Sequence, residues 1–137
     1  MSEFSVRPDW MAFCLPDISE TEVQADADVI RSGWWAKGPR TMEFQKKFAE
    51  YVGAKHCIAV NSCTAALHLA VRLAGVQRGD RVFCQSLTFS ASANPIVYEG
   101  GEPVFLDSEP DTWNLDPETI EAAIARFGVP KALIAVH

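Results

Sequence analysis

Short apolar segments alternate with helical segments from Cys57 onward, and this alternation limits the possible folds more than any other feature of the sequence. Strands are expected at Cys57–Val60, Arg81–Gln85, Val104–Asp107 and Ala132–Val136. Helices are expected between them at Thr64–Ala74, Ser90–Glu99 and Asp116–Phe127. Apolar strands that alternate with helices predict right-handed βαβ units and an α/β fold, with a mostly parallel sheet and flanking helices. The helix Thr64–Ala74 is apolar nearly all round, so we expect it to be buried.

Two further helices are expected before the alternation begins. Ser19 and Glu22 form a capping-box pattern, and Gly33 ends the helix that follows. Pro39 suits the first turn of a second helix, which Gly53 ends. We therefore expect one α/β domain over residues 1–137, with an N-terminal helical arm over about 1–53 and βαβ units over about 54–137.

Charge and composition exclude several classes of function. The net charge is −6 and no run of Lys or Arg occurs, which argues against nucleic acid as a partner. No apolar run is long enough to span a membrane, and the N-terminus lacks a signal-peptide pattern. The four cysteines show no CxxC spacing and the three histidines are scattered, so we expect free thiols, no metal site and a cytoplasmic location.

The turn Asn61–Thr64 joins the first expected strand to the first helix of the alternating part. The N-terminus of a helix offers free N–H donors and a partial positive charge, and both suit a phosphate group. Small residues let a phosphate approach the backbone, and Ser62 and Thr64 add hydroxyl groups. A cap on the helix without any ligand is an equally open interpretation.

An aromatic residue follows the second expected strand. Phe89 lies among small polar residues in "QSLTFSASANP". Ligands of parallel α/β sheets bind beyond the carboxyl ends of the strands, so a ring here could stack on a flat ligand whose phosphate is held by the turn. The alternative is that Phe89 belongs to the hydrophobic core.

Five segments together make a specific pattern. The chain carries, in order, "RSGWWAKGP", "VNSCTAALHLA", "SLTFSASAN", "GGEPVFLD" and "DTWNLDPETIEAAI". This ordered set resembles the N-terminal part of the DegT/StrS family of nucleotide-sugar aminotransferases, over about Leu15 to His137. The resemblance implies the first half of the large domain of the fold type I enzymes, with pyridoxal 5'-phosphate as cofactor. It also implies transfer of an amino group, usually from glutamate, to a nucleotide-linked keto-sugar.

The resemblance also suggests the site residues. The family's phosphate-binding turn matches Ser62, Cys63 and Thr64, where the family often has glycine in place of Cys63. Its ring-stacking aromatic matches Phe89. The loop "WWAKGP" lies near the active site in the family, so the substrate-binding candidates are Trp35, Lys37 and Gly38.

The segment that contains Phe89 also contains an asparagine to which we can assign no role. Asn94 corresponds to a recurrent asparagine of the family. Pro95 removes one backbone N–H, so it should start or kink the helix near Asn94.

The family's lysine and the carboxylate that pairs with the pyridine nitrogen come from elements after the strand that ends the chain. None of the five lysines here matches the lysine motif. We therefore expect a truncated, homo-oligomeric aminotransferase portion with weak or absent cofactor binding, without catalytic residues of its own and inactive alone. The alternative is a stand-alone, non-catalytic α/β module that binds a phosphate-bearing ligand or a partner subunit.

Overall fold

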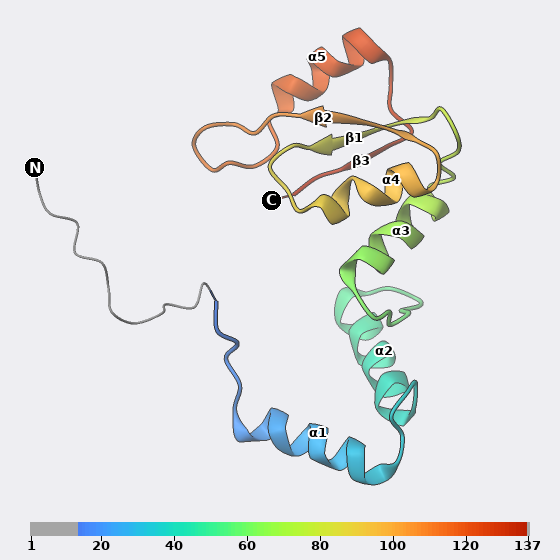
Figure 1. Cartoon of the computed structure of the whole chain (residues 1–137), viewed down its shortest axis with the longest axis vertical. Helices are drawn as coiled ribbons and strands as arrows, with labels where there is room; N and C mark the ends of the chain where they lie inside the picture. Colours follow the sequence, from blue (N-terminus) through green and yellow to red (C-terminus); the bar gives the residue numbers. More distant parts are fainter. Residues whose placement is uncertain (1–13, 137) are drawn as a thin grey trace, which may run out of the picture. The chain divides into compact units, whose positions relative to one another are not determined.

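The computed structural model describes residues 14–136, which form two compact units. The first unit extends to Ala59 and the second begins at Val60 (Figure 1). No helix in the described range is both long and apolar enough to cross a membrane.

Two helices make up the first unit: α1 (Glu20–Ser32) and α2 (Pro39–Val52). The capping box at the start of α1 is confirmed. The backbone N–H of Ser19 donates to the Glu22 carboxylate, and the Ser19 side chain accepts a hydrogen bond from the backbone N–H of Thr21. Gly33 ends α1 with a left-handed φ of 77°, which costs a glycine little. Only Ala49 is buried in these two helices.

The second unit is a parallel sheet covered by helices on both faces. Its strands are β1 (Arg81–Gln85), β2 (Glu102–Leu106) and β3 (Ala132–Ile134), and their order in the sheet is β2-β1-β3. Both pairings are parallel, so the predicted fold class is confirmed. The helices are α3 (Cys63–Leu73), a short 3-10 helix η1 (Ser90–Ser92), α4 (Asn94–Tyr98) and α5 (Pro117–Phe127).

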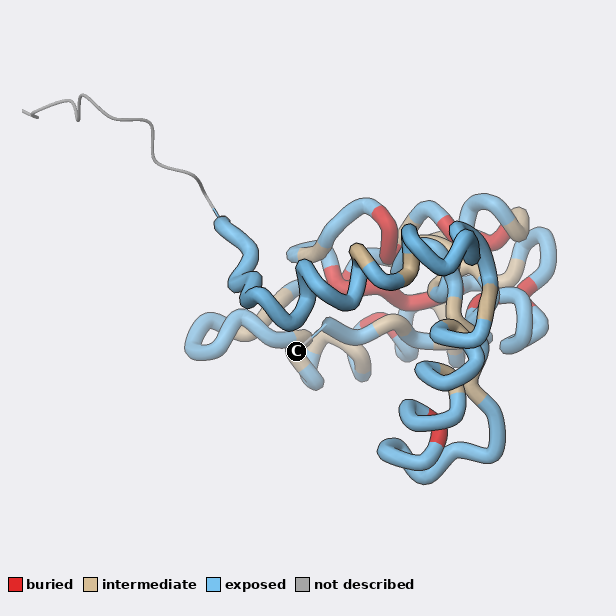
Figure 2. The backbone as a smooth tube through the Cα atoms, turned by 90° about the horizontal axis from the view of Figure 1, so that it is seen from below, coloured by how far each residue is buried: buried red, intermediate tan, exposed pale blue. Residues whose placement is uncertain are grey.

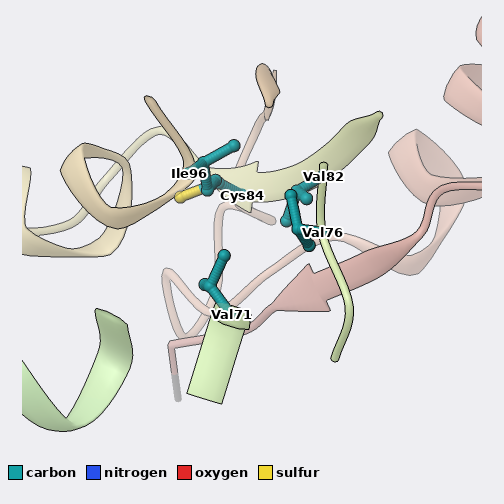
Figure 3. Packing of buried hydrophobic residues seen from close by; sticks show 5 residues of the cluster. All are labelled: Val71, Val76, Val82, Cys84 and Ile96. Carbon is teal, nitrogen blue, oxygen red and sulfur yellow. The ribbon is translucent and has the colours of Figure 1, made fainter. Parts of the chain in front are cut away.

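Alternate side chains of β1 build the two halves of the core. Val82 and Cys84 face α4 and α3, where they pack with Ile96, Val71 and Val76 (Figure 3). Phe83 points to the other face of the sheet, where it packs with Leu106 of β2 and with Ala123 of α5. Figure 2 shows the buried residues concentrated in these elements. The central strand therefore supplies most of the fully buried side chains.

The prediction of a strand at Cys57–Val60 is wrong. These residues form no strand, Ile58 is 73% exposed, and the N–H of Ala59 donates to Oε1 of Gln45 in α2 at 3.0 Å. A strand needs a neighbour that supplies hydrogen-bond partners, and no neighbouring strand pairs with this segment in the described part of the chain.

The expected burial of Thr64–Ala74 is also wrong. Only Val71 of α3 is buried, whereas Leu69 and Leu73 are 46% and 87% exposed. The helix packs against η1 and α4, and its remaining apolar side chains are either half-buried, as Leu67 is, or exposed.

The expected helix Ser90–Glu99 is divided into two. The 3-10 helix η1 ends at Ser92 and α4 begins at Asn94, with Pro95 in its first turn. This confirms the prediction that Pro95 starts or kinks the helix. Strands β2 and β3 form near their expected positions, with β2 beginning two residues earlier than expected and β3 ending at Ile134.

Candidate functional site

Ser62 determines where α3 begins. Its backbone is extended, with φ −162° and ψ 158°, and its Oγ accepts a hydrogen bond from the N–H of Ala65 at 3.2 Å. Its carbonyl accepts from the N–H of Ala66 at 3.1 Å. Ser62 is therefore the N-cap of α3, and its hydroxyl proton is still free to donate to a ligand.

The next two residues leave backbone donors available. The N–H groups of Cys63 and Thr64 have no hydrogen-bond acceptor among the described residues. Cys63 is exposed and Thr64 is half-buried. Free N–H donors in a first turn carry a partial positive charge, so a phosphate dianion fits the chemistry of this turn.

Phe89 lies in the connection that follows β1. Its side chain is 79% exposed, so the alternative of a core role for this residue is wrong. Phe89 is also the N-cap residue of η1, and a hydrogen bond of 2.7 Å between Thr88 Oγ1 and Ser92 Oγ holds the turn around it. A fixed backbone with an exposed ring suits stacking on a flat ligand.

The elements that carry the turn and the ring are neighbours. Both η1 and α4 pack against α3 within the second unit. The turn Ser62–Thr64 stands at the start of α3, and Phe89 directly precedes η1. The parts of the predicted cofactor site thus lie on packed elements, although the assignment of these residues to a cofactor stays a prediction.

The substrate-binding candidates all belong to the first unit. Trp35 is 80% exposed and its Nε1 donates to the carbonyl of Ile30 at 3.0 Å. Gly38 is the N-cap residue of α2 and lines a hollow of about 320 Å³, together with Trp34. A Cβ at Gly38 would lie 3.1 Å from the Trp34 side chain, so a larger residue here would require a small shift of the Trp34 ring. Lys37 is exposed. Their role with substrate stays a prediction.

Two polar residues that the sequence analysis did not identify, Gln85 and Glu99, make several hydrogen bonds to distant parts of the chain. Gln85 is buried at the carboxyl end of β1, where its side chain makes three hydrogen bonds. Glu99 accepts from His68 and lies close to Arg72, both on α3. The only sequence signal for Gln85 is an amide at the end of an apolar strand, and Glu99 lies 31 residues from His68, so no local pattern connects them.

The thiols differ in their surroundings. Cys14 and Cys63 are exposed, Cys57 is half-buried, and Cys84 is buried in the core, where desolvation raises the pKa of its thiol. All four are free, and residues 14–136 contain no group of three or more side chains arranged to hold a metal ion.

The second unit is thus a parallel α/β domain with free backbone donors at the start of α3 and an exposed aromatic ring next to η1. The family model for the DegT/DnrJ/EryC1/StrS aminotransferase family matches residues 16–137. The chain therefore belongs to this family, as its motifs predicted.

Relatives of this chain include a polysaccharide biosynthesis protein and a putative aminotransferase. The spore coat polysaccharide biosynthesis protein SpsC of Bacillus subtilis is 45% identical over 131 residues, which cover 96% of this chain and 33% of SpsC. The putative pyridoxal phosphate-dependent aminotransferase EpsN of the same organism is 51% identical over 127 residues, which cover 89% of this chain and 33% of EpsN.

Solved structures agree with the fold. The PMP form of the putative sugar aminotransferase Spr1654 from Streptococcus pneumoniae matches with a TM-score of 0.78 at 35% identity, over 91% of this chain and 31% of that one. The chain thus spans about a third of the length of the relatives it matches. Family members use pyridoxal phosphate as their cofactor, and they include structures in a PLP form and a PMP form.

Proposed function

We propose that this chain supplies the phosphate-holding and ring-holding part of a pyridoxal phosphate site in a sugar aminotransferase. The observation that carries this proposal is the start of α3, where Cys63 and Thr64 present free N–H groups. The sequence of this turn resembles the phosphate-binding turn of the family. The relatives named above, which include a polysaccharide biosynthesis protein and a sugar aminotransferase, support a sugar as substrate.

Each residue has a definite task in this proposal. The N–H groups of Cys63 and Thr64 and the hydroxyl of Ser62 donate hydrogen bonds to the phosphate oxygens. The exposed ring of Phe89 stacks on the pyridine ring and excludes water from one of its faces. When bound, pyridoxal phosphate supplies the electron sink that amino transfer requires.

The substrate is a nucleotide-linked keto-sugar and the amino donor is glutamate. This part of the proposal rests on the resemblance of the five sequence motifs to the DegT/StrS family. Trp35, Lys37 and Gly38 are the candidates for contacts with the sugar. We expect no amino transfer from residues 1–137 alone, because none of the five lysines matches the family's lysine motif. An assay that detects 2-oxoglutarate formed from glutamate and a nucleotide keto-sugar by this chain would contradict that expectation.

Cofactor binding is tested by titration of the 15N-labelled chain with pyridoxamine 5'-phosphate, which has no aldehyde to react with surface lysines. We expect the largest amide shifts at Cys63 and Thr64. A few charge-assisted hydrogen bonds of roughly 1.5–3 kcal/mol each are offset by association costs of about 4 kcal/mol or more, so the affinity should be millimolar to high micromolar. Pyridoxamine, which lacks the phosphate, should bind more weakly.

The variant Ser62→Asp separates capping from phosphate binding. Aspartate is a good N-cap, so α3 should keep its stability, but its negative charge should repel the phosphate and abolish binding. Thr41→Asp adds the same charge to the first turn of α2 and should leave binding unchanged. Unchanged binding by Ser62→Asp would overturn the proposed site.

Self-association is a separate part of the proposal. The strands β2 and β3 are the edge strands of the sheet, and large apolar side chains of the second unit are exposed, among them Leu73, Phe105 and Val129. Open edges and apolar surface favour association between copies. We expect a dimer or larger species in light scattering, and a monomeric mass at high protein concentration would contradict this.

A further inference from the structure

Two side chains of α3 converge on one carboxylate. Oε1 of Glu99, the residue that follows α4, lies 2.7 Å from Nε2 of His68 and 3.4 Å from a guanidinium nitrogen of Arg72. The Glu99 side chain is only 15% exposed, whereas those of His68 and Arg72 are 39% and 71% exposed. The ring of Tyr98 also meets the ring of His68 edge-on, with 5.4 Å between their centroids.

The apolar anchoring of α3 is slight. Val71 is its only buried residue, so the hydrophobic core holds the helix at one position. Among the described residues, every side-chain hydrogen bond from α3 to another element goes to Glu99. This carboxylate is therefore the main polar contact that fixes α3 against α4.

We propose that Glu99 is a positioning residue for the phosphate turn, an inference that rests on the function proposed above. His68 and Arg72 are four residues apart, so they stand one above the other on the same face of α3. Two contacts a turn apart fix both the tilt of a helix and its rotation about its axis. His68 lies five residues from Cys63, which is about 7.5 Å along the helix at 1.5 Å per residue. A change of tilt at Glu99 therefore displaces the N–H groups of the turn.

The same contact connects the turn with the stacking ring. Glu99 ends the segment η1–α4, and Phe89 begins it. The carboxylate thus holds together the two elements that carry the phosphate donors and the aromatic ring. Binding of a rigid ligand by both depends on their relative placement, because small displacements weaken several interactions at once.

The test compares Glu99→Leu with Glu99→Gln in the complete chain. Glutamine keeps the Oε1 acceptor for His68, whereas leucine removes it. We expect Glu99→Leu to weaken binding of pyridoxamine 5'-phosphate about tenfold and to speed hydrogen exchange of the α3 amides by a similar factor, since it removes the acceptor of both hydrogen bonds from α3. Binding of pyridoxamine should change less than about twofold, because that ligand does not need the turn. Glu99→Gln should restore most of the affinity, and Glu121→Leu, an exposed carboxylate of α5, serves as the control and should behave as the unaltered chain.

Three results would overturn the role of Glu99. These are unchanged affinity of Glu99→Leu for pyridoxamine 5'-phosphate, an equal loss for both ligands, and the same loss in Glu121→Leu. An equal loss for both ligands would indicate a purely structural role. Failure of the proposed function is read from the unaltered chain instead: if it does not prefer pyridoxamine 5'-phosphate over pyridoxamine, the phosphate turn itself is refuted, and the assignment of Glu99 falls with it.

Discussion

The side-chain oxygen of Gln85 accepts a hydrogen bond from the backbone N–H of Val136 at 3.2 Å. Its Nε2 donates to Ser108 Oγ at 2.7 Å and to the carbonyl of Trp113 at 2.9 Å. One buried amide thus connects the end of β1 with the segments that follow β2 and β3. Trp113 has a φ of 66°, which is uncommon for a non-glycine residue, so this hydrogen bond helps to hold a strained turn.

Replacing this amide should destabilise the second unit. Gln85→Leu leaves the three partners of the amide without their hydrogen bonds, and we expect a loss of about 2–4 kcal/mol in the free energy of unfolding, measured by urea denaturation. Gln77→Leu changes an exposed glutamine of the same unit and should cost less than about 0.5 kcal/mol. Equal effects of the two substitutions would show that the buried hydrogen bonds contribute little.

Phe89 should matter for ligand binding and little for stability. Because its ring is 79% exposed, Phe89→Ala should change the free energy of unfolding by less than about 0.5 kcal/mol. Loss of a stacking contact of about 0.5–1.5 kcal/mol should weaken binding of pyridoxamine 5'-phosphate about 2- to 13-fold in the NMR titration. Tyr51→Ala removes another exposed ring and is the control. A strong loss of stability in Phe89→Ala would instead assign the ring a structural role.

The thiols should react in the order of their exposure. We expect an aromatic disulfide reagent to label Cys14 and Cys63 fast, Cys57 more slowly, and Cys84 only when the chain unfolds, because Cys84 is buried and its raised pKa lowers the thiolate fraction. A phosphate ligand on the α3 turn should slow labelling of Cys63 but not of Cys14. Mass spectrometry of the labelled peptides distinguishes the four sites, and equal protection of Cys14 and Cys63 would argue against binding at the turn.

The start of α1 should loosen in acid. Hydrogen bonds from the Ser19 side chain and backbone lower the pKa of the Glu22 carboxyl from the ordinary value of 4.5. A lowered folded pKa means that this stabilisation is complete above the ordinary value and is lost as the pH falls through the folded pKa. Hydrogen exchange of the first-turn amides of α1 should therefore lose protection below pH 4.5 in the parent chain.

Glu22→Gln and Glu20→Gln separate the capping box from general effects of acid. The first removes the ionising group, so its first-turn protection should no longer depend on pH in this range. The second changes a neighbouring acid of the same turn and should keep the parent profile. If the first-turn protection of Glu22→Gln depended on pH as it does in the parent chain, the capping-box explanation would be contradicted.

The sequence predicted best where the determinants are local. Ser19, Gly33, Pro39 and Asp116 act on backbone groups within a few residues, and each stands at the helix end where it was expected. The strands of the parallel sheet were also found, because their apolar runs are short and bounded by helices. The turn Ser62–Thr64 begins a helix as expected, since the cap bond joins residues only three apart.

Errors arose where the outcome depends on distant partners. The run Cys57–Val60 has the apolar character of a strand, but pairing requires a neighbouring strand that its own letters do not specify. The exposure of α3 likewise depends on what packs against it, and the contacts made by Glu99 and Gln85 span 31 and 51 residues. Such pairs cannot be derived from local periodicity.

The strand order β2-β1-β3 has a consequence for synthesis on the ribosome. Val82 of β1 pairs with Pro103 on one side and with Ala132 on the other, so its second partner is made some 50 residues after it. At about 5–20 residues per second, one edge of β1 waits roughly 3–10 seconds for its partner strand. During that interval the backbone N–H and C=O groups on one side of β1 have no partner strand in the nascent chain. This is the stage at which binding of a chaperone to the apolar strand would be most useful.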